Sequence, residues 1–313
     1  MASETTMTGP ENEMAVQHTL AAPLVLEGIG LHQGTPVILA LKPAAADHGI
    51  VFVRSDLDAP LNERTIPARY DHVSDTMMCT TISNKYGASV ATIEHLMAAI
   101  AGLGIDNLLI EVDAPEMPVM DGSSEIFLGE LMKIGLEAQD APRKALRIVK
   151  PVQLVDGAKE AALLPGDGFA MDVSIDFDNK VIGRQSASLS LANGAFRKHL
   201  GKARTFGFLK DVEALKQLGL GLGGSLENAI VIDGDEVMNE DGLRFDDEFV
   251  RHKALDAVGD LALAGLPILG TFKGVRPGHD MNNRILRALF ASPDAFEVVT
   301  LSAAEAAKLP SAA

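Results

Sequence analysis

Histidine and carboxylate residues recur at helical spacing in the sequence HKALDAVGD, residues 252–260. On an α-helix, a rotation of about 100° per residue brings His252, Asp256 and Asp260 onto one face. His252 and Asp256 lie one turn apart and can chelate one ion, whereas Asp260 lies a further turn away and is better placed to orient another side chain. The same spacing is common on solvated acidic helix faces. A metal site therefore requires a third ligand from elsewhere in the chain.

A candidate third ligand stands in the sequence TIEHL, residues 92–96. Glu94 and His95 are neighbours on a short predicted helix, about 100° apart, so one can bind a metal while the other reaches its water. His95, His252 and Asp256 together supply three nitrogen or oxygen ligands and leave a fourth tetrahedral position open, as catalytic zinc sites do. Glu94 would then be the general base. A lone Glu-His pair also fits an ordinary helix surface, so the hypothesis depends on this convergence.

Two further side chains fit hydrolytic chemistry. His279, in the sequence GHDMNN, precedes a predicted helix and can project into a site and pair with Asp260. Thr205, in KARTFGF, carries a hydroxyl that can donate to an oxyanion. Taken alone, His279 is equally well explained as a histidine in a surface loop. Thr205 taken alone is equally well explained as a threonine at the end of a strand.

The glycine-rich sequence GLGLGG, residues 219–224, satisfies the G-x-G-x-x-G pattern of dinucleotide-binding turns. That fingerprint requires a strand before it and a helix after it. Here residues 211–218 are predicted as a helix and residues 228–232 as a strand, which is the reverse order. The glycines instead favour a tight turn or a close approach to a ligand, and dinucleotide binding is not expected.

The elements that must position these residues are strands interspersed with a few helices. Apolar runs and alternation predict strands over residues 36–42, 50–54, 77–82, 108–112, 146–154, 161–164 and 169–177. Helices are predicted over residues 93–101 and 124–134, after Asp246 and after Asp280. We expect loose tails over residues 1–18 and 302–313, a first domain over 19–137, a polar linker over 138–145 and a second domain over 146–301.

The composition is that of a globular protein, with 47% hydrophobic and 22% charged residues among 313. The net charge of −16 argues against a nucleic-acid or anionic-membrane surface. A single cysteine, Cys79, excludes a disulfide within the chain and fits a reducing compartment. No apolar run approaches the roughly 20 residues of a membrane span, and the polar first 18 residues lack a signal-peptide core. A cytoplasmic protein is expected.

Six motifs carry a resemblance to a known family. The sequences TIEHLMAAIAGLGIDN, PVMDGS, ARTFGF, GLGLGGS, NEDGLRFDDEFVRHKALDAVGDL and GHDMNN resemble those of the UDP-3-O-acyl-N-acetylglucosamine deacetylases, the zinc amidases that commit Gram-negative bacteria to lipid A synthesis. The resemblance spans residues 20–301. It implies an α+β fold of two domains with similar topology, each a β-sheet plus helices, packed helix layer to helix layer with the active site between them. It also implies that an insert over residues 206–232 forms a passage for the acyl chain.

Carried onto this sequence, the resemblance implies His95, His252 and Asp256 as ligands of one Zn²⁺ per chain and Glu94 as general base. It further implies that Thr205 faces the carbonyl oxygen and that Asp260 orients His279. Lys253 and His279 are implied to assist the reaction. The residues implied in substrate binding are His32, Phe206, Gly224 and Lys253. The sequence departs from the family pattern at Met97, Gly221 and the pair Arg276-Pro277, none of which is a ligand.

The implied partner is an acylated UDP-sugar, whose N-acetyl group would be hydrolysed to acetate and a 2-amino sugar nucleotide. We expect no nucleic acid, at most transient contact with a membrane surface, and a monomer. Two alternatives stay open: a catalytically silent sugar-nucleotide or acyl-chain binding protein that kept the scaffold, and a zinc hydrolase that acts on another amide. The intact ligand set and base count against the first, and the acyl passage counts against a protease.

Overall fold

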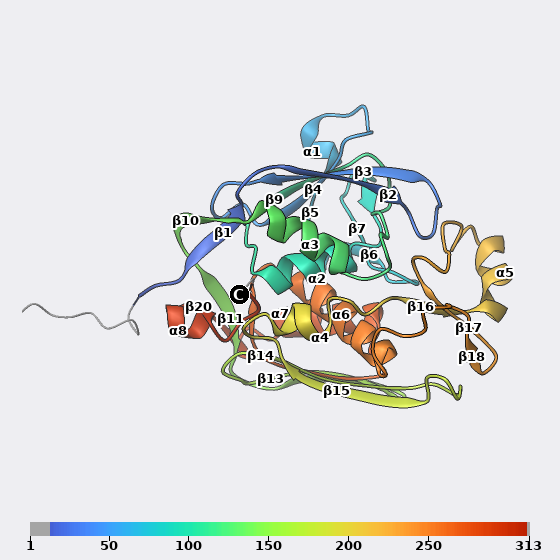
Figure 1. Cartoon of the computed structure of the whole chain (residues 1–313). Helices are drawn as coiled ribbons and strands as arrows, with labels where there is room; N and C mark the ends of the chain where they lie inside the picture. The colour runs from blue at the N-terminus through green and yellow to red at the C-terminus, as the bar shows by residue number, and fades with distance from the viewer. Residues whose placement is uncertain (1–12, 312–313) are drawn as a thin grey trace, which may run out of the picture.

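Two large β-sheets form opposite layers of the structure, a computed structural model that describes residues 13–311 (Figure 1). The first sheet has five strands in the order β2-β3-β9-β4-β5. These strands are β2 (Leu24–Ile29), β3 (Pro36–Pro43), β9 (Leu108–Val112), β4 (Ile50–Arg54) and β5 (Thr65–Pro67). Alternation explains which face is buried: Leu39 and Leu41 have no exposed surface, whereas Ile38 between neighbouring buried residues is 48% exposed. The predicted strands over residues 36–42, 50–54 and 108–112 are confirmed.

The second sheet has seven strands, and its centre is the long strand β19, which pairs with β11, β13 and β14. Its strands are β11 (Lys144–Ile148), β12 (Val152–Asp156), β13 (Lys159–Leu164), β14 (Phe169–Asp176), β15 (Arg184–Ser190), β19 (Ile268–Val275) and β20 (Phe296–Thr300). The strand predicted over residues 146–154 is broken in two, because residues 149–151 leave the sheet and Pro151 has no N–H to donate.

Several helices lie between the two sheets, whereas the short helix of residues 61–64 lies on the outer side of the first sheet and the helix of residues 209–217 lies to one side (Figure 1). The helices are α1 (Leu61–Arg64), α2 (Glu94–Leu103), α3 (Glu125–Ile134), α4 (Ala195–His199), α5 (Leu209–Gln217), α6 (Glu248–Ala262), α7 (His279–Phe290) and α8 (Ala303–Ala306), with a 3₁₀ turn η2 (Tyr70–His72). The helix α2 lies directly on α6. A Cβ atom at Gly259 would lie 2.0 Å from the carbonyl oxygen of Glu94, so only glycine permits this approach. The close approach brings the Glu94-His95 pair next to the His252–Asp260 face.

Three small sheets complete the fold. Strands β6 (Val73–Asp75), β7 (Thr81–Ser83) and β8 (Ser89–Val90) form one, and β16 (Phe206–Phe208), β17 (Ile230–Asp233) and β18 (Glu236–Val237) form another beside α5. The strand predicted over residues 77–82 is wrong for most of its length. The chain bends there instead, and Met78 has a left-handed backbone with φ 67°, which a regular strand does not allow.

The last residues of the expected amino-terminal tail and most of the expected polar linker are regular rather than loose, because they belong to the third small sheet. Strand β1 (Val16–Leu20) pairs antiparallel with β10 (Leu136–Pro142), which covers most of the residues expected to be a linker. Residues 302–311 of the expected carboxyl-terminal tail are also ordered: Ser302 and Glu305 form a capping box at α8, and Leu309 is fully buried. Residues 1–12 of the expected tail lie outside the described part. Across residues 13–311, no helix is both long and apolar enough to cross a membrane.

Candidate metal centre

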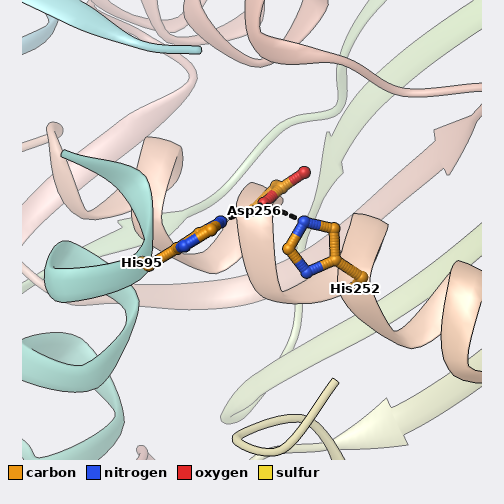
Figure 2. Close-up of side chains that lie close together, drawn as sticks. All are labelled: His95, His252 and Asp256. Atoms are coloured by element: carbon orange, nitrogen blue, oxygen red, sulfur yellow. Dashed lines mark ion pairs between the residues drawn. The ribbon is translucent and has the colours of Figure 1, made fainter. Parts of the chain in front are cut away.

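Three buried side chains converge where α2 meets α6 (Figure 2). Asp256 Oδ1 lies 3.3 Å from Nε2 of His252 and 3.7 Å from Nε2 of His95. One potential ligand atom from each of these residues lies within 4.8 Å of the other two. The expected convergence of His95 from one helix with the i, i+4 pair of another is therefore confirmed as geometry.

The donor set suits a metal cation. Asp256 Oδ1 is buried and has no hydrogen-bond partner among residues 13–311, although it lies between two imidazole nitrogens. Nδ1 of His252 lies 3.0 Å from the carbonyl oxygen of Ala203, and an N–H donated there leaves the Nε2 lone pair free to coordinate. Burial lowers the pKa of His252 to about 3, so its imidazole is neutral as a ligand must be. Two imidazoles and one carboxylate are typical ligands of catalytic zinc.

Glu94 begins α2 beside this centre. Burial raises the pKa of its carboxyl to about 7, which is the range in which a general base is most effective at neutral pH. The backbone N–H of Thr80 donates to Oε2 at 3.1 Å, and Oε1 lies 3.8 Å from Nε2 of His279. Glu94 is thus held by contacts that leave it next to the three clustered side chains rather than among them.

The predicted pairing of His279 with Asp260 is confirmed. Nδ1 of His279 lies 2.9 Å from Asp260 Oδ2. Asp260 also accepts hydrogen bonds from Thr80 Oγ1 at 2.5 Å and from Asn282 Nδ2 at 2.9 Å. Burial alone would lower the pKa of His279, but Asp260 and Glu94 outweigh it and raise that pKa to about 9. His279 is consequently a buried imidazolium at neutral pH.

Lys253 and Phe206 border the same cluster. Lys253 Nζ lies 2.9 Å from Asp256 Oδ2 and 5.6 Å from the centre of the Phe206 ring. The Phe206 ring also packs edge-on against His252, with centroids 6.3 Å apart. Burial would lower the pKa of Lys253, but Asp256 outweighs this and raises it, so the ammonium remains charged. The apolar ring of Phe206 and the fixed cation of Lys253 therefore lie side by side at the edge of the centre.

Thr205 lies where the chain enters β16. Its N–H donates to the carbonyl oxygen of Gly122 at 2.7 Å, and its own carbonyl accepts from Ile230 at 2.8 Å. A Cβ at Gly122 would come within 2.0 Å of the carbonyl oxygen of Asn228, so the Asp121-Gly122 turn and the start of β17 hold Thr205 from both sides. The structure places this half-buried threonine two residues after Ala203, the acceptor of His252.

His32 lies in the loop of residues 30–34, which packs against the glycine turn of residues 219–224. Leu222 donates to the carbonyl oxygen of His32 and Gly223 to that of Leu31, each at 3.0 Å. The His32 ring is 7% exposed, and neither of its nitrogens has a hydrogen-bond partner among residues 13–311. Gly224 follows in the same turn. The helix α5 precedes the turn and β17 follows it, so the reversed order that excludes a dinucleotide fingerprint is confirmed.

Thr80, Asn282 and Glu116 were missed by sequence reasoning. Asn282 stands three residues after His279, a spacing that places both on one helix face, so the GHDMNN sequence did contain a signal. Thr80 is 180 positions from its partner Asp260, and Glu116 is 84 positions from His32. No local pattern connects residues at such separations.

A cavity of about 310 Å³ lies elsewhere, near the carboxyl-terminal ends of α2 and α6. Its lining includes Ile100, Gly104, Val258, Leu261 and Arg143. It contains none of the metal-centre residues. This cavity is therefore a poor guide to the chemistry of this fold, and the convergence of His95, His252 and Asp256 is the better one.

Comparison with known proteins gives a consistent result. The sequence profile of the family described as UDP-3-O-acyl N-acetylglycosamine deacetylase matches residues 17–291. A UDP-3-O-acyl-N-acetylglucosamine deacetylase of Pasteurella multocida is 48% identical over 289 residues, covering 92% of this chain and 94% of the relative. Relatives of the same name from Phenylobacterium zucineum and Idiomarina loihiensis are 49% and 48% identical, covering 91% and 94% of this chain and 97% and 95% of their own lengths. The chain belongs to the UDP-3-O-acyl N-acetylglycosamine deacetylase family.

Proposed function

We propose that this protein hydrolyses the N-acetyl group of UDP-3-O-(3-hydroxyacyl)-N-acetylglucosamine, releasing acetate and the 2-amino sugar nucleotide, as the committed step of lipid A synthesis. The observation that carries the proposal is the buried, unpartnered Asp256 Oδ1 between two histidine nitrogens in a chain of this family. A buried carboxylate oxygen left without a partner is costly, and a metal ion would satisfy it.

His95, His252 and Asp256 would hold one Zn²⁺. When bound, zinc supplies a Lewis acid that polarises a carbonyl and acidifies water. Burial lowers the pKa of His95 as it does that of His252, and although burial would raise the pKa of Asp256, His252 and Lys253 outweigh it and lower that pKa. Neutral imidazoles and an ionised carboxylate match the preference of zinc for nitrogen and oxygen donors. Three protein ligands are the number that catalytic zinc sites typically provide.

Glu94 takes a proton from the attacking water in this mechanism. A carboxyl pKa of about 7 makes it a far stronger base than an exposed glutamate, while it remains partly ionised at neutral pH. It adjoins the ligand His95 in sequence, so it stands beside the reacting atoms without binding the metal. The same carboxyl can return its proton to the departing amine, a step for which His279 is the second candidate donor.

The remaining residues stabilise charge. Thr205 donates a hydrogen bond from its hydroxyl to the oxyanion that develops on the former acetamide carbonyl oxygen, and loss of one such donor typically costs about 2.7 to 4 kcal/mol of barrier. The His279 imidazolium, oriented by Asp260, places a cation beside the same centre. Lys253 contributes a second cation at the edge facing Phe206. These charges are fixed before substrate binds, so they need no reorganisation during the reaction.

His32, Phe206, Gly224 and Lys253 would contact the sugar nucleotide, and the insert over residues 206–232 would receive the acyl chain. Apolar side chains around the glycine turn support this role: Leu209, Leu218, Leu222 and Leu226 are 38%, 71%, 52% and 45% exposed. Exposed leucines so close together are typical of a surface that binds an apolar partner. We further propose that residues 19–137 and 146–301 act as two domains, with the substrate bound between them.

The experiment is to incubate the zinc-loaded protein with the acylated N-acetyl sugar nucleotide and to measure acetate and free amine together. Equal amounts of both products are expected, and release should be far slower with Glu94→Gln. Binding of the substrate without release of either product would favour a silent binding protein. Release of amine from unrelated acetylated peptides but not from the sugar nucleotide would favour a hydrolase of another amide.

A further inference from the structure

The carboxylate of Glu116 joins two segments that both carry residues of the proposed site. Glu116 is fully buried. Its Oε1 accepts hydrogen bonds from the backbone N–H of His32 at 2.8 Å and from Thr92 Oγ1 at 3.0 Å, while Oε2 accepts from the backbone N–H of Gln33 at 2.8 Å. One side chain thus connects the loop of residues 30–34 to Thr92, which lies two residues before the start of α2. Hydrogen bonds to an ionised acceptor are stronger than neutral ones.

The main chain around Glu116 makes the same connection. Met117 donates to the carbonyl oxygen of Ala91 at 3.0 Å, and Val119 donates to that of Ile29 at 2.9 Å. A Cβ at Gly30 would lie 2.5 Å from Glu116 Oε2, so the loop approaches the carboxylate as closely as glycine allows. Residues 115–119 are therefore a strap between the start of α2 and the loop that carries His32.

Thr92 connects the strap to the start of α2 through its hydroxyl group. It has a left-handed backbone with φ 58°, which is a costly conformation for a β-branched residue. Its hydroxyl donates to Glu116, and Glu94 follows two residues later. The hydrogen bond helps to hold the strained turn from which Glu94 and His95 enter α2.

The His32 ring needs an accurate position. Its two nitrogens are buried without a partner among residues 13–311, an arrangement that is unfavourable until a ligand supplies hydrogen bonds. Burial lowers the pKa of the ring, so at neutral pH it is neutral and offers one donor and one acceptor. Both groups are directional, so their use depends on how firmly the loop is held.

We propose that Glu116 is a positioning residue that fixes the loop of residues 30–34, and with it the His32 ring, relative to the metal helix α2. The inference rests on the proposed substrate contact of His32. Glu116 itself is fully buried, so it would not contact the substrate. It would act through the backbone and side-chain groups that donate hydrogen bonds to it. A loss of substrate affinity on changing Glu116 should therefore depend on the presence of His32. A carboxylate with only a structural role would lower the stability of the protein, and its effect would not depend on His32.

The first test measures hydrogen exchange at single backbone amides in the zinc-loaded protein. Glu116→Gln keeps the size of the side chain but turns an N–H group towards one of the two backbone donors. Exchange at His32 and Gln33 should accelerate roughly tenfold or more, the effect of losing one charged hydrogen bond. The matched variant Thr92→Val removes only the threonine hydroxyl and should leave these two amides protected. Unchanged exchange in Glu116→Gln overturns the proposal.

The second test is a double-mutant cycle on KM for the acylated substrate. Glu116→Gln should raise KM roughly tenfold with full zinc content and a much smaller change in kcat. His32→Ala should raise KM as well, and adding Glu116→Gln to it should raise KM little further, because coupled residues are not additive. An undiminished rise in the His32→Ala background overturns the proposal.

A control separates positioning from the general loss of a buried acceptor. Asp106 accepts the backbone N–H of His18 at 2.9 Å and pairs with Arg143 at 2.9 Å, beyond the far end of α2. Asp106→Asn should lower stability but leave KM unchanged, and an equal rise in KM there contradicts the inference. If His32→Ala alone leaves KM unchanged, the proposed substrate contact fails and the positioning role fails with it. Unchanged hydrogen exchange in Glu116→Gln overturns the positioning role but does not contradict the proposed contact of His32 with the substrate.

Discussion

Nδ1 of His279 lies 2.9 Å from Oδ2 of Asp260, and both groups are buried beside the proposed metal centre. The carboxylate stabilises the charged imidazole against the cost of burial, and the pKa of His279 rises to about 9. The imidazolium lies 3.8 Å from Glu94 on its other side. A cation is therefore fixed between two acidic groups, and its loss at high pH should have a measurable effect on turnover.

Catalytic efficiency should fall as the pH rises through about 9, where His279 loses its proton. Asp260→Asn removes the main group that raises this pKa, so the alkaline limb should move to lower pH. The acidic limb, assigned to Glu94 and its water, should stay nearly fixed, although coupled groups share their apparent pKa values. The measurement is a pH profile of kcat/KM for wild type, Asp260→Asn and His279→Gln. An alkaline limb unmoved in both variants would eliminate the charged-histidine role.

Glu94→Gln should retain zinc but lower kcat by about 10² to 10⁴, the usual contribution of a general base. The reason is that Glu94 lies outside the cluster of His95, His252 and Asp256. His95→Ala should lose both the metal and turnover. Elemental analysis of each purified variant, paired with an acetate assay, makes the comparison. Loss of zinc from Glu94→Gln would identify that carboxylate as a ligand and contradict the assigned role.

Removing the acyl chain from the substrate should reduce kcat/KM by several orders of magnitude. Each buried methylene contributes about 0.8 kcal/mol, and the exposed leucines of residues 206–232 offer the apolar surface. Substrates of graded chain length, assayed at one pH, would measure the increment per methylene. Equal efficiency with and without the chain would contradict an acyl passage in this insert.

Gly259→Ala should destabilise the fold, because the new methyl group would overlap the carbonyl oxygen of Glu94 across the contact of α2 with α6. Overpacking of this kind costs about 1–3 kcal/mol. Gly129→Ala in α3 is the matched control, since nothing lies within 4 Å of its added Cβ and alanine favours a helix by up to about 1 kcal/mol. Denaturant unfolding compares the two. An equal loss of stability in both variants would argue against a special role for the close approach.

The site was predictable from the sequence where its geometry is local. The i, i+4 relation of His252 and Asp256 follows from helix geometry alone, and it recurs in the structure as a distance of 3.3 Å. The partners of Asp260 show the limit. His279 and Asn282 stand in one short motif, but Thr80 comes from a bend whose strand prediction was wrong. Its position depends on tertiary packing that no local pattern records.

The fold was predictable where strands alternate in burial, as in β3 and β14. It was not predictable for β1 and β10, whose pairing joins residues more than a hundred positions apart. The sequence of β10 predicts a linker because it is polar and contains a proline. In the structure four of its seven residues are exposed, and a two-stranded ribbon does not need an apolar face along its whole length. Hydrogen bonding to a distant partner, rather than composition, makes this segment regular.

We propose that His95, His252 and Asp256 hold the one metal ion that hydrolysis requires. The most direct measurement is acetate release from the acylated sugar nucleotide while the metal-free protein is titrated with Zn²⁺. We expect no release without metal, a linear rise in rate as Zn²⁺ is added, and saturation at one equivalent per chain, with Asp256→Ala inactive throughout. Full acetate release by the metal-free protein, or by metal-loaded Asp256→Ala, would contradict it.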